Sequence, residues 1–164
     1  MKKFLLVALM FAPMSLMAQK FGHFNSADII PTLPEYTKAQ AELQNLAQQY
    51  EEDLKRMQDE LQKKSDDFQK EAPNLLENVR QRREQELNEL YQRMQQSYQD
   101  NQQALNKAQT EKLQLISDKV TSAVKQIGEA GGYVYIMDTS MGIPFISTKF
   151  STDITPELKK ALGL

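Results

Sequence analysis

The chain has 164 residues, contains no cysteine, and carries 20 Lys plus Arg residues against 22 Asp plus Glu residues, a formal net charge of −2. Without cysteine it can form neither a disulfide nor a lipidated cysteine anchor. The mildly acidic balance argues against a general nucleic-acid-binding protein, which needs a basic face.

Residues 1–18 have the pattern of a cleaved signal peptide. Lys2 and Lys3 precede an apolar run over residues 4–17, and the small residue Ala18 is the expected last residue before the cut. The run is short against the roughly 20 apolar residues of a bilayer span, so a retained membrane anchor is the less favoured alternative. Removing the leader lowers the basic count from 20 to 18 against 22 acidic residues, or about −4, and leaves an exported protein.

Residues 19–34 are expected to start a small folded body. The run at residues 20–25 alternates apolar and polar side chains, which predicts a strand. A turn or short helix should follow over residues 26–34, where Asp28, Pro31 and Pro34 interrupt the pattern.

Residues 35–127 predict a long helical hairpin that forms an arm. Between residues 25 and 127 the sequence has no glycine and three prolines, and most residues after Glu35 are polar helix formers. The apolar stripe from Leu43 to Leu61 advances 18 residues in five steps, an average of 3.6, which is the helical period. Pro73 should end the first helix and place the tip near residues 72–75. The stripe is too thin for a globular core, so the arm should project into water.

Residues 128–164 are expected to complete the body. Three glycines at positions 128, 131 and 132 should end the second helix. The β-prone run at residues 133–138 and a second run at residues 143–146 predict a β-hairpin, and residues 155–162 predict a terminal helix with Thr155 as its N-cap. The predicted fold class is therefore α+β.

The body should self-associate. A body of roughly 50 residues without disulfides buries too little apolar surface to be stable by itself, and self-association would supply the missing contacts. Its open strand edges and apolar side chains are the expected subunit contacts. These candidate contacts are Phe21, Phe24, Val134, Ile136 and Phe145.

No catalytic or metal-binding pattern is present in the sequence, so we expect neither an enzyme nor a cofactor. His23 is the single histidine, and a His/Cys metal cluster or Cys/His nucleophile is therefore excluded. No Gly-Lys-Ser/Thr phosphate loop occurs. The basic cluster of Arg80, Arg82 and Arg83 is interleaved with glutamates at four-residue spacing, which favours a solvated helix face over a nucleic-acid site.

The order of these elements resembles the Skp/OmpH family of periplasmic chaperones. The resemblance rests on the leader, the strand ending in Phe24-Asn25, the Gln-rich hairpin, the Tyr-Val-Tyr-Ile-Met-Asp strand and the closing Asp-Ile-Thr-Pro-Glu-Leu-Lys-Lys. It covers residues 19–164. The family implies a periplasmic homotrimer with a β-rich body and three arms around a cavity. That cavity would hold unfolded outer-membrane proteins without ATP and prevent their aggregation.

Charge is the main departure from this family. Its best-known members are basic and hold clients partly by a positive surface, whereas this chain is acidic. No residue-by-residue match to the proposed lipopolysaccharide-binding residues is visible, which leaves lipid or lipopolysaccharide contact open.

Client contact is expected on isolated apolar side chains near the tip, namely Phe68, Leu75, Leu76 and Tyr91. Several weak contacts on one extended client would add up while each stays quick to break. The residues of the regular stripe are expected to form the seam between the two helices instead. These seam residues are Tyr50, Leu54, Met57, Leu61, Leu90, Met94 and Tyr98.

A structural coiled-coil scaffold of the cell envelope is the alternative function. Such a scaffold should sustain a dense heptad seam, whereas this stripe is sparse and has a period near 3.6 residues.

Overall fold

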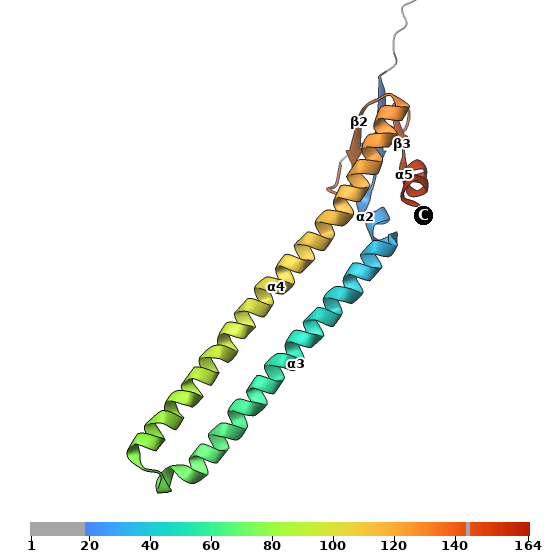
Figure 1. Ribbon diagram of the computed structural model, residues 1–164. Coiled ribbons are helices and arrows are strands. Elements are labelled where there is room, and N and C mark those ends of the chain that lie inside the picture. Colours follow the sequence, from blue (N-terminus) through green and yellow to red (C-terminus); the bar gives the residue numbers. More distant parts are fainter. Residues whose placement is uncertain (1–18, 144) are drawn as a thin grey trace, which may run out of the picture.

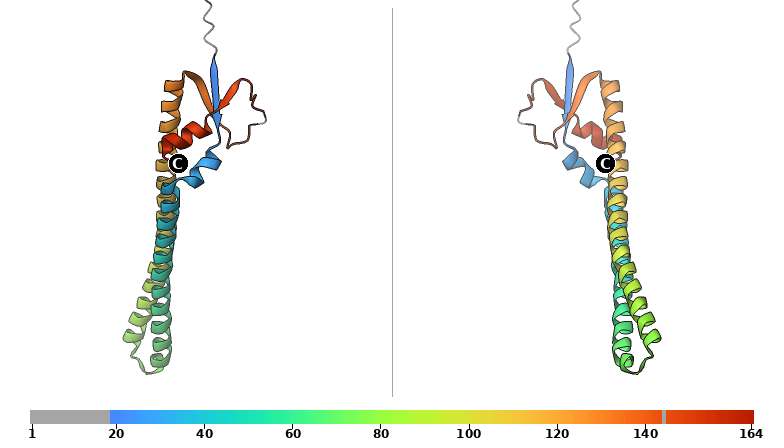
Figure 2. Two further views of the ribbon diagram at one scale, coloured as in Figure 1. Left: turned by 90° about the vertical axis from the view of Figure 1, so that its right-hand side faces the viewer. Right: turned by 90° about the vertical axis from the view of Figure 1, so that its left-hand side faces the viewer.

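The computed structural model describes residues 19–143 and 145–164 (Figure 1). The expected signal peptide, residues 1–18, lies outside them. In chain order the elements are β1 (Lys20–Phe24), α2 (Ser26–Ile29), the 3₁₀ turn Ile30–Thr32, α3 (Pro34–Glu71), the 3₁₀ turn Ala72–Asn74, α4 (Glu77–Gly131), β2 (Tyr133–Asp138), β3 (Ser151–Asp153) and α5 (Thr155–Leu162). A small sheet and two short helices lie at one end, and the long arm extends from them (Figures 1 and 2). The predicted α+β fold with a long helical arm is confirmed.

The arm is an antiparallel pair of α3 and α4, which Figures 1 and 2 show side by side. With 38 and 55 residues, the two helices are about 57 Å and 82 Å long at 1.5 Å per residue. Helix α3 has Pro34 in its first turn, where a missing N–H costs no hydrogen bond, and it ends just before the 3₁₀ turn that contains Pro73. The tip therefore lies where the proline predicts it.

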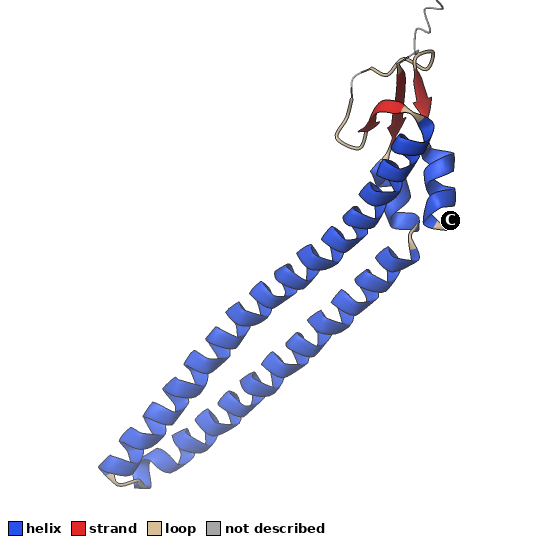
Figure 3. Ribbon diagram, turned by 45° about the horizontal axis from the view of Figure 1, so that its top comes forward, coloured by secondary structure: helices blue, strands red, loops and turns tan. Residues whose placement is uncertain are grey.

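Helix α4 is longer than α3 and continues into the body (Figure 3). Its buried residues Ile116, Val120 and Ala123 belong to the same apolar core as Ile29 and Leu158. The arm was predicted to extend to residue 127, but the last turns of α4 form one wall of the body. The reason is the stripe itself, which becomes aliphatic from Ile116 onward and can bury a continuous face.

The sheet has the order β2-β1-β3, and both outer strands run parallel to β1. The predicted β-hairpin is therefore wrong. Residues 143 and 145–146 are outside any strand, and the third strand is Ser151–Asp153. Strand β1 lies between β2 and β3, so the chain must cross the sheet after β2 to reach the other side of β1. A parallel arrangement of β2 and β3 requires such a long connection. Residues 139–150 provide it.

The body core lies between the sheet, α4 and α5. The fully buried side chains are Ile29, Leu33, Ile154 and Leu158. Helix α5 begins at Thr155, whose N–H donates to Asp153 Oδ1 at 2.9 Å, so the capping acceptor is Asp153 and not Thr155 as predicted. Hydrogen bonds from Thr155 hold the pKa of Asp153 below its usual value.

Candidate functional site

The predicted contact residues of the arm lie in two places. Phe68, Leu75 and Leu76 flank the turn at the tip, where Phe68 and Leu75 are half-buried and Leu76 is 73% exposed. Tyr91 is 46% exposed but lies 15 residues beyond Leu76 on α4, about 22 Å along the helix axis. The structure therefore brings three of the four together and separates Tyr91 from them.

The seam between α3 and α4 is only loosely closed. Leu90 is buried, with 3% of its surface exposed, whereas Tyr98 is 56% exposed. Leu54, Leu61 and Met94 are half-buried. Because these side chains cover one another incompletely, a groove remains along the middle of the arm.

We call this feature the arm groove. It has a volume of about 770 Å³. Its lining residues are Leu54, Gln58, Leu61, Gln62, Tyr91, Met94, Gln95, Tyr98 and Gln99. Sequence reasoning missed the four glutamines because the whole arm is rich in glutamine. The only signal was their spacing, since Gln58 and Gln62, like Gln95 and Gln99, stand four residues apart and share a helix face.

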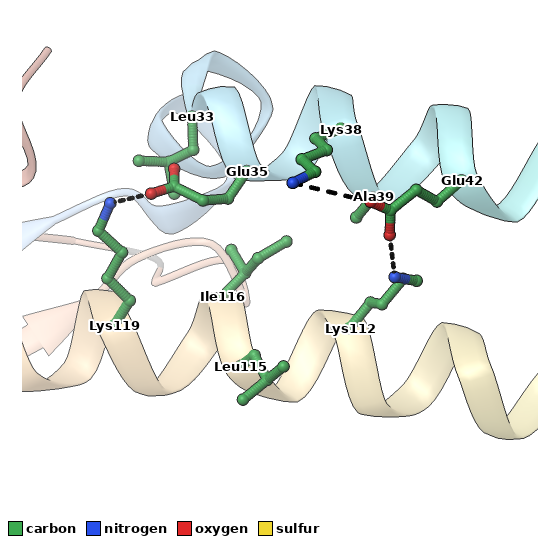
Figure 4. Close-up of a pocket in the computed structure, with 9 residues that line it drawn as sticks. All are labelled: Leu33, Glu35, Lys38, Ala39, Glu42, Lys112, Leu115, Ile116 and Lys119. Carbon is green, nitrogen blue, oxygen red and sulfur yellow. Dashed lines mark hydrogen bonds and ion pairs between the residues drawn. The ribbon is translucent and has the colours of Figure 1, made fainter.

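A second cavity, of about 250 Å³, lies at the base of the arm and is shown in Figure 4. Leu33, Ala39, Leu115 and Ile116 supply its apolar lining. Two ion pairs cross it between the helices: Lys119 donates to Glu35, and Lys112 donates to Glu42 (Figure 4). Lys38 lies 3.9 Å from Glu42 as well. These pairs join the start of α3 to α4 at the point where the arm leaves the body.

The two cross-helix ion pairs should stabilise the arm base in a pH-dependent way. A hydrogen bond from Lys119 lowers the pKa of Glu35, and one from Lys112 lowers the pKa of Glu42, from a usual value of 4.5. When the pKa of a glutamate is lower in the folded state than in the unfolded state, its ionised form stabilises the fold. This stability is fully present above the pKa of the unfolded state and is lost as the pH falls through the pKa of the folded state. Glu35→Gln should therefore lower Tm at pH 7 by a small amount, and the difference should vanish well below pH 4.5.

A charge reversal provides the control for this prediction. Lys119→Glu should lower Tm at pH 7 because it faces Glu35 with a like charge, and the double variant Glu35→Lys with Lys119→Glu should recover most of the loss. High salt should reduce all these differences, because the groups are exposed. Thermal unfolding followed by circular dichroism measures them. A Glu35→Gln effect that does not shrink as the pH falls below 4.5 would contradict the electrostatic explanation.

The body presents an apolar surface around the sheet. Of the predicted subunit contacts, Phe24 is buried in the chain's own core with 7% exposure, whereas Phe145 is 80% exposed. Val134 is also exposed, and Phe21 and Ile136 are half-buried. The ring of Phe21 packs on Tyr135 with 4.7 Å between centroids. The exposed residues therefore lie on β2 and on the connection between β2 and β3, while Phe24 is already used inside the subunit.

The described part of the chain offers no candidate metal centre. Within residues 19–143 and 145–164, no three His, Asp or Glu side chains come together as a metal site would require. His23 Nδ1 shares a hydrogen bond with Ser151 Oγ at 2.8 Å, which joins β1 to β3. None of the helices that the structure describes is both long and apolar enough to span a bilayer.

Two of three comparisons with known proteins found a match. The family model "Outer membrane protein (OmpH-like)" matches residues 20–162. The crystal structure of a proposed outer membrane chaperone (OmpH-like) from Caulobacter crescentus CB15 is similar, with a TM-score of 0.75 and 14% sequence identity. The match covers 88% of this chain and 83% of that chain, so it extends over the body and the arm. A search of the curated proteins finds no match.

Proposed function

The chain belongs to the OmpH-like family of outer membrane proteins, and from this premise we propose that it is an ATP-independent chaperone. In this role it acts in the periplasm, after removal of residues 1–18, and holds unfolded outer-membrane proteins so that they do not aggregate. The C. crescentus protein of the same fold, described as a proposed outer membrane chaperone, supports this proposal.

The observation that carries the proposal is the distribution of apolar surface on the arm. Leu76 and Tyr91 are exposed and Phe68 and Leu75 are half-buried. Leu75 and Leu76 are adjacent, and mostly polar residues separate this pair from Phe68 and from Tyr91 along the arm. An extended client could touch several of them at once, and its total affinity would then exceed that of any single contact. Each contact is weak enough to break quickly, which suits release without an energy source.

A cyclic homotrimer fits the topology of the sheet. The sheet ends in two different strands, β2 on one side and β3 on the other, and all of its strands are parallel. Joining β2 of one copy to β3 of the next is a head-to-tail contact, and such a contact closes into a ring if the rotation permits. The resemblance to Skp/OmpH chaperones implies three copies. Val134, Ile136, Phe145 and Phe21 would then lie at the contacts, whereas Phe24 would not.

The test is a measurement of mass and of holding activity on the same preparation. The chain from Gln19 to Leu164 should have the mass of a trimer in solution. At near-stoichiometric trimer it should keep a β-barrel outer-membrane protein soluble after dilution from urea. If it forms the trimer but the barrel protein precipitates as fast as without it, the scaffold function is preferred.

Replacing Leu75, Leu76 and Tyr91 together with Ser should weaken the holding activity and leave the trimer intact. Losing three exposed apolar contacts should raise the concentration needed for half-maximal suppression roughly fivefold to tenfold. The control is Leu113→Ser with Leu115→Ser, the same kind of change on exposed residues of α4 near the body. Equal suppression by the triple variant and the wild type would contradict the assignment of these residues.

A further inference from the structure

The arm groove has no charged residue in its lining. This is unusual for the arm, because five of the nine residues around the base cavity are charged. The four glutamines Gln58, Gln62, Gln95 and Gln99 are all exposed at the edges of the groove. An uncharged lining neither attracts nor repels a ligand by net charge, so selection must depend on shape and hydrogen bonding.

Two of the four amide groups at these edges are available for a ligand. Gln62 donates to Asp66 and Gln95 donates to the Tyr91 hydroxyl at 2.7 Å. Throughout the described ranges, no hydrogen bond to another protein group involves the side chain of Gln58 or of Gln99. A glutamine amide has two N–H donors and a carbonyl acceptor, so it can pair with either side of a peptide group. It therefore recognises a polypeptide backbone independently of the sequence of side chains.

The floor of the groove is apolar. Leu54, Leu61 and Met94 are half-buried there, and Met94 can adapt its shape to different partners. In an extended chain successive side chains point to opposite faces, so every second residue could rest on this floor while the others face water. The strands of outer-membrane barrels alternate apolar and polar residues in this way.

The length of the groove suits a short extended segment. On α3 its lining runs from Leu54 to Gln62, and the adjoining groove toward Ala47 is lined by the charged residues Glu51, Lys55 and Asp59. From Leu54 to Gln62 the helix rises about 12 Å at 1.5 Å per residue. About four residues of extended chain span that distance at 3.3 Å each.

We propose that the arm groove binds an extended, uncharged polypeptide segment with apolar residues at alternate positions, and that Gln58 and Gln99 pair with its backbone. The inference rests on the proposed chaperone function and specifies how that function selects its clients. Recognition by side-chain amides requires no positive surface, and an acidic chain can therefore hold clients without one.

The test measures binding of one peptide to three forms of the chain from Gln19 to Leu164. The peptide has ten residues that alternate Leu or Tyr with Ser, and it carries a neutral solubilising tail, a fluorophore and a photo-crosslinker. Fluorescence anisotropy should show about tenfold weaker binding to Gln58→Glu with Gln99→Glu, in which each amide donor is replaced by a carboxylate. The control Gln44→Glu with Gln103→Glu adds the same charge on the arm outside the groove and should bind like the wild type. Cross-links should fall within residues 54–62 and 91–99.

A second peptide isolates the backbone contribution. The same sequence N-methylated at alternate amides keeps its side chains but loses half of its donors, and we expect it to bind the wild type about tenfold more weakly. Equal binding of the two peptides, equal binding by the groove variant and the wild type, or cross-links outside the groove would each overturn the inference.

The same preparations separate this inference from the proposed function. If the groove variant binds the peptide like the wild type and still prevents barrel aggregation, the groove is not the peptide site, but the proposed chaperone function stands. If the wild type binds the peptide in the groove but fails to prevent aggregation, the chaperone function is rejected and the groove remains a peptide-binding site.

Discussion

Leu158→Ala is expected to lower the free energy of unfolding by about 2–5 kcal/mol, the usual cost of such a truncation in a packed core. Leu158 is fully buried, with 0% of its surface exposed, and belongs to the same core as Ile154 and Val120. The loss is large for this protein because the body is small and has no disulfide to limit unfolding. Urea denaturation followed by circular dichroism measures it.

Leu164→Ala provides the matched control. The chemical change is the same and the site is six residues away, but Leu164 is 44% exposed and lies beyond the end of α5. Its substitution should change the unfolding free energy by less than about 0.5 kcal/mol. Similar losses for the two variants would show that α5 is not packed as the structure has it.

Gly132→Ala and Gly128→Ala are expected to shift stability in opposite directions although the substitution is the same. Gly132 has a φ of 65° and caps α4 in the left-handed region, where a side chain costs about 1–2 kcal/mol. Gly128 lies inside α4, where alanine is better than glycine by about 0.5–1 kcal/mol. A Cβ at position 128 would lie 3.4 Å from Ile136 Cδ1, an ordinary contact.

Denaturation of the two single variants and of the double variant checks this prediction. The double variant should fall close to the sum of the two effects, unless the residues couple through the last turn of α4. If Gly132→Ala stabilised the protein, Gly132 would not have the left-handed conformation that ends α4 directly before β2.

The helical arm was predictable from the sequence because its signals are local. The absence of glycine, the 3.6-residue stripe and Pro73 each constrain the backbone near themselves, and the structure places the tip at the 3₁₀ turn that contains this proline. The strand at Tyr133–Asp138 likewise has a strong local preference, since five of its six residues are β-branched, aromatic or Met.

The sheet order was not predictable because strand pairing is a contact between distant residues. Residues 143–146 have a higher strand preference than Ser151–Asp153, yet the latter pairs with β1. Parallel pairing depends on a connection long enough to cross the sheet, which no local pattern reveals. The arm groove escaped prediction for a similar reason: its glutamines come from two helices and resemble every other glutamine of the arm until the helices are placed side by side.

The position of the arm between β1 and β2 determines the order in which the chain can fold. Phe24 and Tyr133 lie at neighbouring strands, but 108 residues separate them along the chain. Closing so large a loop in an unfolded chain is entropically costly, and a folded hairpin removes most of that cost by bringing its two ends together. The arm should therefore also speed folding. We expect the helical hairpin to form early, starting from its tip, and the parallel sheet to form last, once the folded arm has brought β2 and β3 close to β1.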